Sequence, residues 1–163
     1  MGQKQDIETI LSNIKTILTD NLSSKLIAIT TDKSNDITLP NIDSNAYALQ
    51  SLQNKIVMNY NPFIFYGIQN INNQSVGARI SEELEVFIII CFYDSNNDLD
   101  ENTVSKRAFR YLRALREIFE EHWADILTYG KIYIDSLIPI ELSLMNSNQN
   151  HRAVGVNLKI AIV

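Results

Sequence analysis

The chain has 163 residues, of which 45% are hydrophobic and 20% charged, and its formal net charge is −5. This length is enough for one domain with a hydrophobic core, and the proportions of apolar and charged residues exclude a disordered chain and a coiled coil. The acidic balance argues against a protein that binds nucleic acid with its whole surface, although it is compatible with a local basic face.

The N-terminus and the single cysteine indicate a protein made and kept in a reducing cytoplasm. The first residues, MGQKQDIE, contain no apolar core of a signal peptide. No stretch approaches the roughly 18 consecutive apolar residues that span a bilayer, so we expect no membrane segment. Cys91 lies inside an apolar run, which excludes a disulfide framework within one chain and predicts a buried structural thiol.

An amphipathic helix is predicted at residues 6–22, where the sequence reads DIETILSNIKTILTDNL. The apolar residues that recur there at helical spacing are Ile7, Ile10, Leu11, Ile14, Ile17, Leu18 and Leu22. Residues 31–62 are polar and rich in turn formers, and no period can be fixed in them. We therefore predict a long irregular segment, which in a compact domain usually has a function such as reaching a neighbour.

Two strands are predicted in the middle of the chain. The first is PFIFYGIQNI, residues 62–71, which can begin at Pro62 because proline occupies a first strand position without losing a ladder hydrogen bond. A loop is expected next, at residues 72–79. The second strand is EELEVFIIICFYD, residues 82–94, which is apolar on both faces through its middle. Such a strand belongs in the centre of a sheet with a layer on each face.

Two further strands are predicted near the C-terminus, at residues 130–142 and 152–163. The last one alternates apolar and small or polar residues, which is the pattern of a half-buried strand. Short polar loops between strands favour antiparallel pairing. We therefore expect an α+β fold with a mainly antiparallel sheet of about four strands, flanked by the N-terminal helix and a long central helix. We expect residues 1–163 to form a single domain.

The central helix is predicted at residues 101–127 and contains KRAFRYLRALREIFEEHW, with an arginine at every third position. On a helical wheel of about 100° per residue, the apolar residues from Val104 through Trp123 to Ile126 share one sector. All four arginines are expected to face away from it, and they are Arg107, Arg110, Arg113 and Arg116.

Acidic residues share that polar half of the helix, and they include Glu117, Glu120, Glu121 and Asp125. The spacing predicts ion pairs Arg113–Glu117 and Arg116–Glu120, each contributing a few tenths of a kcal/mol. A helix that binds a nucleic-acid duplex keeps its positive charge uncompensated, so this near balance favours a solvated face or a protein contact.

Phe109 distinguishes these two readings. On the wheel it falls outside the apolar sector, between Arg113 and Arg116. An aromatic side chain flanked by arginines has the composition of interface cores. Phe109, Arg113 and Arg116 are therefore the candidate subunit interface, and a simple solvated face is the alternative.

No pattern of catalytic, metal-binding or cofactor-binding residues is found. His122 is expected to be a packed or half-exposed helix residue, and His151 is expected in a polar loop without neighbours to complete a metal site. Glu82, Glu83 and Glu85 read as the solvated end of a strand. Glycine-rich phosphate loops do not occur. We predict that the chain is not an enzyme and has no cofactor and no metal.

Three stretches carry a resemblance to a known group, and they are YNPFIFYGIQN, GARISEELEVFIIICFYD and RAFRYLRALREIF. In this order the chain resembles the tail terminator and neck (head–tail joining) proteins of tailed bacteriophages. Many of those proteins have Tyr-Pro before the first strand, whereas this chain has Asn61 between Tyr60 and Pro62.

The resemblance implies a structural role in the virion. Such proteins form a ring, usually of six subunits, that caps the tail tube, stops its polymerisation and presents a surface to the head connector. DNA only passes through the lumen, and a net acidic protein suits such a weakly repelling channel. The family has no catalytic residues to carry over.

Other roles stay open at this point. A head-completion or other connector protein would have a similar layout. A small regulatory domain that binds nucleic acid predicts salt-sensitive DNA binding, lost when Arg110 and Arg113 are reversed in charge. A small enzyme would need an acidic pair or His122 assembled by the fold.

Overall fold

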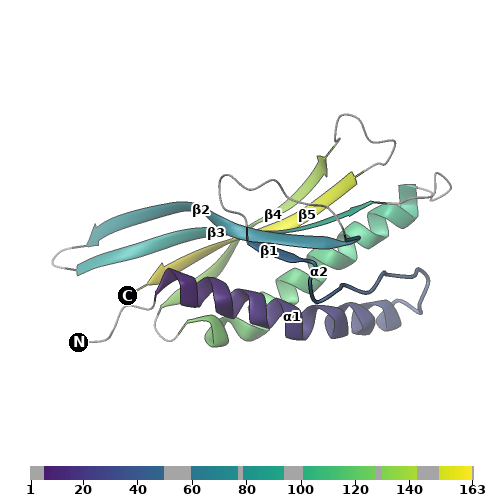
Figure 1. Ribbon diagram of the computed structural model, residues 1–163, viewed down its shortest axis with the longest axis horizontal. Coiled ribbons are helices and arrows are strands. Elements are labelled where there is room, and N and C mark those ends of the chain that lie inside the picture. The colour runs from purple at the N-terminus through teal and green to yellow at the C-terminus, as the bar shows by residue number, and fades with distance from the viewer. Residues whose placement is uncertain are drawn as a thin grey trace.

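The computed structural model describes residues 6–49, 60–76, 79–93, 101–127, 130–142 and 151–162. Two helices lie against the same face of a five-stranded sheet (Figure 1), so the fold is α+β, as predicted. The elements in chain order are α1 (Ile7–Asp32), β1 (Tyr47–Leu49), β2 (Phe63–Val76), β3 (Arg79–Tyr93), α2 (Glu101–Ile126), β4 (Lys131–Leu142) and β5 (His151–Ile162).

The sheet has the strand order β1-β2-β3-β5-β4. All pairs from β2 to β4 are antiparallel, which confirms the main expectation. The expectation of about four strands missed β1, which pairs in parallel with β2 at Ile64–Tyr66. A three-residue strand is too short to show a period in the sequence.

The predicted loop at residues 72–79 was wrong. The β2–β3 ladder continues to the pair Val76↔Arg79, so most of that polar stretch is strand. Asparagine, glutamine and serine are depleted in strands, and the prediction therefore ended the strand at Ile71. Backbone hydrogen bonds between β2 and β3 continue through these residues, although their sequence has no apolar pattern.

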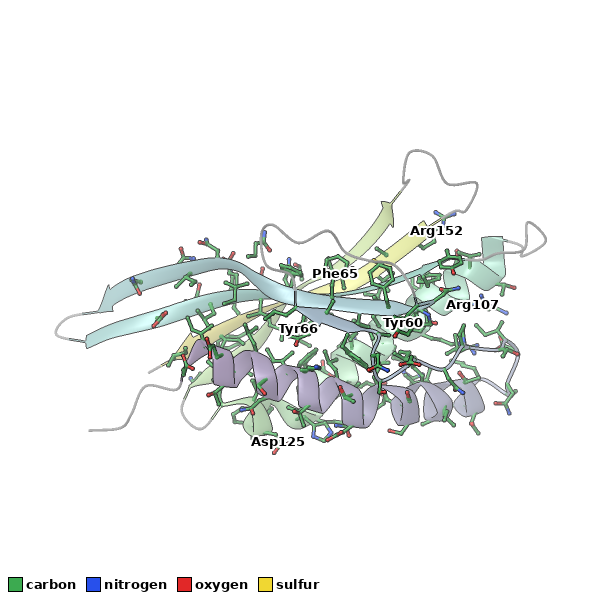
Figure 2. All side chains as sticks on the ribbon, in the orientation of Figure 1. Tyr60, Phe65, Tyr66, Arg107, Asp125 and Arg152 are labelled. Atoms are coloured by element: carbon green, nitrogen blue, oxygen red, sulfur yellow. The ribbon has the colours of Figure 1, made fainter. Side chains whose placement is uncertain are left out.

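The core lies between the sheet and the two helices. Side chains of β3 that face the helices are almost completely buried, as are their neighbours on β5; they are Leu84, Val86, Ile88, Ile90, Val156, Leu158 and Ile160. Figure 2 shows Tyr66 on this side of β2 and Phe65 on the opposite side.

Within the described residues, no helix covers the second face of the sheet, where a second layer was expected, although Phe63 and Phe65 are buried on it. Cys91 is buried there, while Phe87 and Ile89 are only half-buried. Both helices that the structure describes cover the first face (Figure 1). The apolar composition of β3 therefore predicted the burial of its helix-facing side chains and overestimated that of Phe87 and Ile89.

Helix α1 is longer than predicted, since it continues to Asp32 and buries Leu26 and Ile29 in its second half. Serine, threonine and β-branched residues lower the helix propensity of this half, and tertiary packing overrides that preference. Residues 33–46 then return from α1 to β1 without helix or strand, so the predicted irregular segment 31–62 is correct for this part only. Its first two residues belong to α1, residues 47–49 form β1, and residues 50–59 lie outside the described part of the chain. At the end of the returning segment 33–46, the Ala46 carbonyl accepts a hydrogen bond from the Ile64 amide at 2.7 Å.

Asn61 anchors the start of β2. Its side-chain Nδ2 donates to the Tyr93 carbonyl at 2.7 Å, and the Tyr93 amide donates to its Oδ1 at 3.0 Å. The last backbone pair of the two strands is Phe63↔Cys91. The asparagine amide thus replaces a further backbone pair, and β2 begins at Phe63 instead of Pro62.

Candidate subunit interface

Helix α2 lies between α1 and the β4 edge of the sheet. On one side it contacts α1, where Lys25 Nζ lies 2.7 Å from Glu121 Oε2. On the sheet it packs against β5 and β4. Helix α1 contacts β1, where the Tyr47 hydroxyl donates a hydrogen bond to the Leu18 carbonyl at 3.3 Å. One flank of α2 is therefore turned away from α1, toward the β4 side of the molecule.

The prediction that all four arginines face away from the core was wrong for Arg110. Its residue exposure is 6%, and its guanidinium pairs with the carboxylate of Asp36 in the returning segment. Lys106 Nζ approaches the same carboxylate at 3.0 Å. The hydrogen bonds from Arg110 and then Lys106 lower the pKa of Asp36 to about 2. A helical wheel cannot show that a distant segment folds over one row of residues.

Arg113 and Arg116 are exposed and carry the predicted ion pairs. Arg113 Nε lies 2.6 Å from Glu117 Oε1, and Arg116 Nε lies 2.9 Å from Glu120 Oε1. Arg113 also approaches Asp32 of α1, with its Nη1 3.2 Å from Oδ2. These contacts compensate the positive charge of both arginines, as the sequence indicated.

Phe109 is 67% exposed, more than any other large hydrophobic residue among those that the structure describes. Trp123 was predicted to lie in the core stripe, and this was wrong because it is 47% exposed. The backbone of His122 is not helical, with φ −112° and ψ 15°, so α2 is kinked there. A helical wheel assumes a uniform rotation per residue, so it gives the wrong direction for side chains that follow such a kink.

Phe109, Arg116 and Trp123 follow one another at intervals of seven residues and form what we call the α2 flank. Seven residues make about two helical turns, so Phe109 and Arg116 share one side of the helix. This side lies about 100° round the helix from the row of Arg110 and Glu117, which faces α1 and its returning segment. Trp123 lies beyond the kink at His122 and is grouped with them because its side chain is also exposed. Arg113, the third residue of the predicted interface, is exposed as well, and its guanidinium also reaches Asp32 of α1.

Cysteine and histidine side chains, which could act as nucleophile, base or metal ligand, do not form a reactive site in the described residues. Burial raises the pKa of the Cys91 thiol to about 12. His122 is half-exposed, as predicted, and its Nδ1 lies 3.0 Å from Asp125 Oδ2. His151 is the first residue of β5 and not part of a loop. Within the described parts of the chain, no three His, Cys, Asp or Glu residues gather as metal ligands.

A groove of about 270 Å³ lies between the second half of α1 and the returning segment. Its lining is apolar and neutral polar, without an ionisable side chain. The apolar lining residues are Leu26, Ile27, Ile37, Leu39, Pro40 and Ile42. Such a lining can hold an apolar group but offers no acid, base or nucleophile.

No protein-family model matches this chain, and no curated protein is significantly similar to it. Among the described helices, neither is long and apolar enough to cross a membrane.

Proposed function

We propose that the chain is a structural protein of a tailed-phage virion, namely a tail terminator. It forms a ring, usually of six subunits in that family, which caps the tail tube and joins it to the head connector. It is made in the host cytoplasm, carries no catalytic activity, and contacts DNA only as the genome passes through the lumen.

The observation that carries this proposal is the α2 flank. Phe109 and Trp123 are the two exposed aromatic residues of α2, and Arg116 lies between them. Tryptophan and arginine are among the residues enriched in the centre of protein interfaces, where they are buried against the partner. The three sequence stretches of the resemblance fall on β2, on β3 and on α2.

Binding to nucleic acid is the weaker alternative. Arg110 is buried against Asp36, and the exposed Arg113 and Arg116 are each paired with a carboxylate. A protein that binds nucleic acid uses unpaired lysine and arginine side chains to neutralise phosphates, and the counterions of the nucleic acid are released. The arrangement of α2 therefore supports contact with protein more than contact with DNA.

Light scattering after size-exclusion chromatography tests the proposal, with the chain alone and with tail-tube protein. We expect a mass several times that of one chain in at least one of these conditions. A strict monomer in both conditions would contradict a ring. An assembly that binds head proteins and ignores tail tubes would assign the chain to head completion instead.

A further inference from the structure

The exposed large hydrophobic residues of the described chain fall into two groups, one on α2 and the edge strand β4, the other on α1 and the opposite edge of the sheet. One group, on the β4 side, comprises Phe109, Trp123, Tyr133 and Leu137. The other group, on the β1 side, comprises Ile27, Leu49 and Ile71.

The β4 side combines the α2 flank with the edge of the sheet. Strand β4 pairs only with β5 among the described strands, so no described strand covers its other edge. Leu137 pairs with the buried Val156, which places it on the helix face of β4 and hence on the same side of the sheet as α2. It is nevertheless exposed, because β4 is the last strand. Tyr133 adds an exposed aromatic ring on the opposite face of the same strand.

The β1 side is built from α1 and the other edge of the sheet. Ile27 follows Lys25 by two residues, so it points about 160° away from the lysine that contacts α2. Leu49 ends the short edge strand β1. Ile71 lies on β2 beyond the residues that β1 covers. This side is therefore formed by different elements from those of the β4 side.

Charge differs between the two sides in a complementary way. On α1, the exposed Asp20 precedes Ile27 by seven residues and shares its side of the helix. On α2, the exposed Arg116 follows Phe109 at the same interval. Each side thus offers an apolar residue and a nearby charge, with opposite signs. Arg116 also pairs with Glu120 of its own helix, an exposed i,i+4 contact worth a few tenths of a kcal/mol.

The edge of β4 is poorly suited to extending the sheet into another molecule. Its register shifts between Ile134 and Ser136, and Pro139 lacks an amide hydrogen. Bulges and prolines on edge strands oppose edge-to-edge pairing. Contact at this side therefore has to rely on side chains.

We infer that the β4 side of one copy binds the β1 side of a second copy of this chain, in a head-to-tail contact. A contact between two different patches is heterologous, and such contacts close into rings when the rotation between subunits permits it. A self-complementary contact would instead place one patch against itself. This inference rests on the proposed function and adds to it the two surfaces that meet.

Two single substitutions each block one side of the contact. Native mass spectrometry then measures the number of subunits in each assembly, under the condition in which the wild type assembles. Phe109→Glu blocks the β4 side and Ile27→Glu blocks the β1 side. We expect each variant alone to be monomeric. An equal mixture should give a dimer and no ring. The intact β4 side of Ile27→Glu can bind the intact β1 side of Phe109→Glu, whereas the two remaining sides are blocked.

The matched control is Ala28→Glu, an exposed position adjacent to Ile27 that points about 100° away from it. It should assemble as the wild type does, and thermal unfolding of all variants should remain close to that of the wild type. The inference is overturned if Ile27→Glu alone still assembles fully, or if the mixture of two monomeric variants stays monomeric. A wild type that assembles in no condition overturns the proposed function as well.

Discussion

Arg110 of α2 is buried beneath the segment that follows α1, where its guanidinium pairs with the carboxylate of Asp36. This pair joins two parts of the chain that are 74 residues apart in sequence. It ties the irregular return from α1 to β1 against the second helix. A buried guanidinium needs such a partner, because an uncompensated buried charge is strongly destabilising.

Replacing Asp36 should therefore destabilise the fold more than replacing its neighbour in the same region, Asp32. Asp36→Asn removes the charge that faces the buried Arg110, whereas Asp32→Asn removes one exposed contact to Arg113, which retains Glu117. Exposed pairs contribute little to stability. Urea unfolding should give a clearly lower midpoint for Asp36→Asn and a midpoint near that of the wild type for Asp32→Asn. Equal midpoints for both variants would argue against the role of this pair.

The same pair predicts a pH dependence. The pKa of Asp36 is lowered from 3.8 to about 2, chiefly by its hydrogen bond from Arg110. A carboxyl group with a lowered folded-state pKa stabilises the fold above its unfolded-state pKa, and this contribution disappears as the pH falls to the folded-state value. The difference in unfolding free energy between the wild type and Asp36→Asn should be constant from pH 7 to about 5. It should then shrink between about pH 4 and pH 2.

Phe109→Ala should weaken assembly while leaving the monomer intact. Because the ring is exposed in the monomer, its removal should change the unfolding free energy by no more than about 0.5 kcal/mol. Phe119→Ala, a matched change in the same helix, removes a buried ring and should cost about 3–5 kcal/mol. Denaturant titration combined with light scattering separates the two effects. A large loss of monomer stability in Phe109→Ala would contradict an interface role.

Trp123 provides a direct optical report of the interface. It is the single tryptophan of the chain and is half-exposed in the monomer. If the α2 flank is covered on assembly, its fluorescence should shift to shorter wavelength as the protein concentration rises through the assembly range. The Ile27→Glu variant, kept monomeric, should retain the long-wavelength emission. Assembly without any change in emission would place Trp123 outside the contact.

Asn61→Ala should loosen the junction between the start of β2 and the end of β3. It removes two hydrogen bonds to the Tyr93 backbone, each contributing about 0.5–1.5 kcal/mol, so the expected loss is about 1–3 kcal/mol. Hydrogen exchange should show faster exchange of the Tyr93 amide than in the wild type. In the control Asn61→Asp, an acceptor for this amide remains, so its protection should be partly retained. An unchanged exchange rate in Asn61→Ala would show that the side chain does not hold this end of the ladder.

The periodic parts of the fold could be predicted from the sequence. Helix α2 and strand β5 show a clear apolar period, and strand β3 is a long apolar run; their predicted bounds, like those of β4, lie close to the observed ones. The second half of α1 and the end of β2 have weak local preferences. Their structure depends on packing and on backbone pairing with a distant strand, which a local pattern does not show.

The candidate interface was only partly predictable for a related reason. The wheel placed Phe109 and Arg116 on the outer side of α2, where they lie. It failed for Arg110, which is covered by a segment 74 residues away in sequence, and for Trp123, which follows the kink at His122. A wheel assumes an isolated and straight helix, and each error marks one departure from that assumption.

Electron microscopy of the purified chain, alone and mixed with tail tubes, tests the proposed ring most directly. We expect closed rings of a fixed number of subunits, usually six in the family that the sequence resembles, and rings seated at tube ends where they stop further growth. Ring formation should be lost in Phe109→Glu and in Ile27→Glu. Fields of single subunits, together with tubes that elongate as they do without the protein, would contradict the proposal.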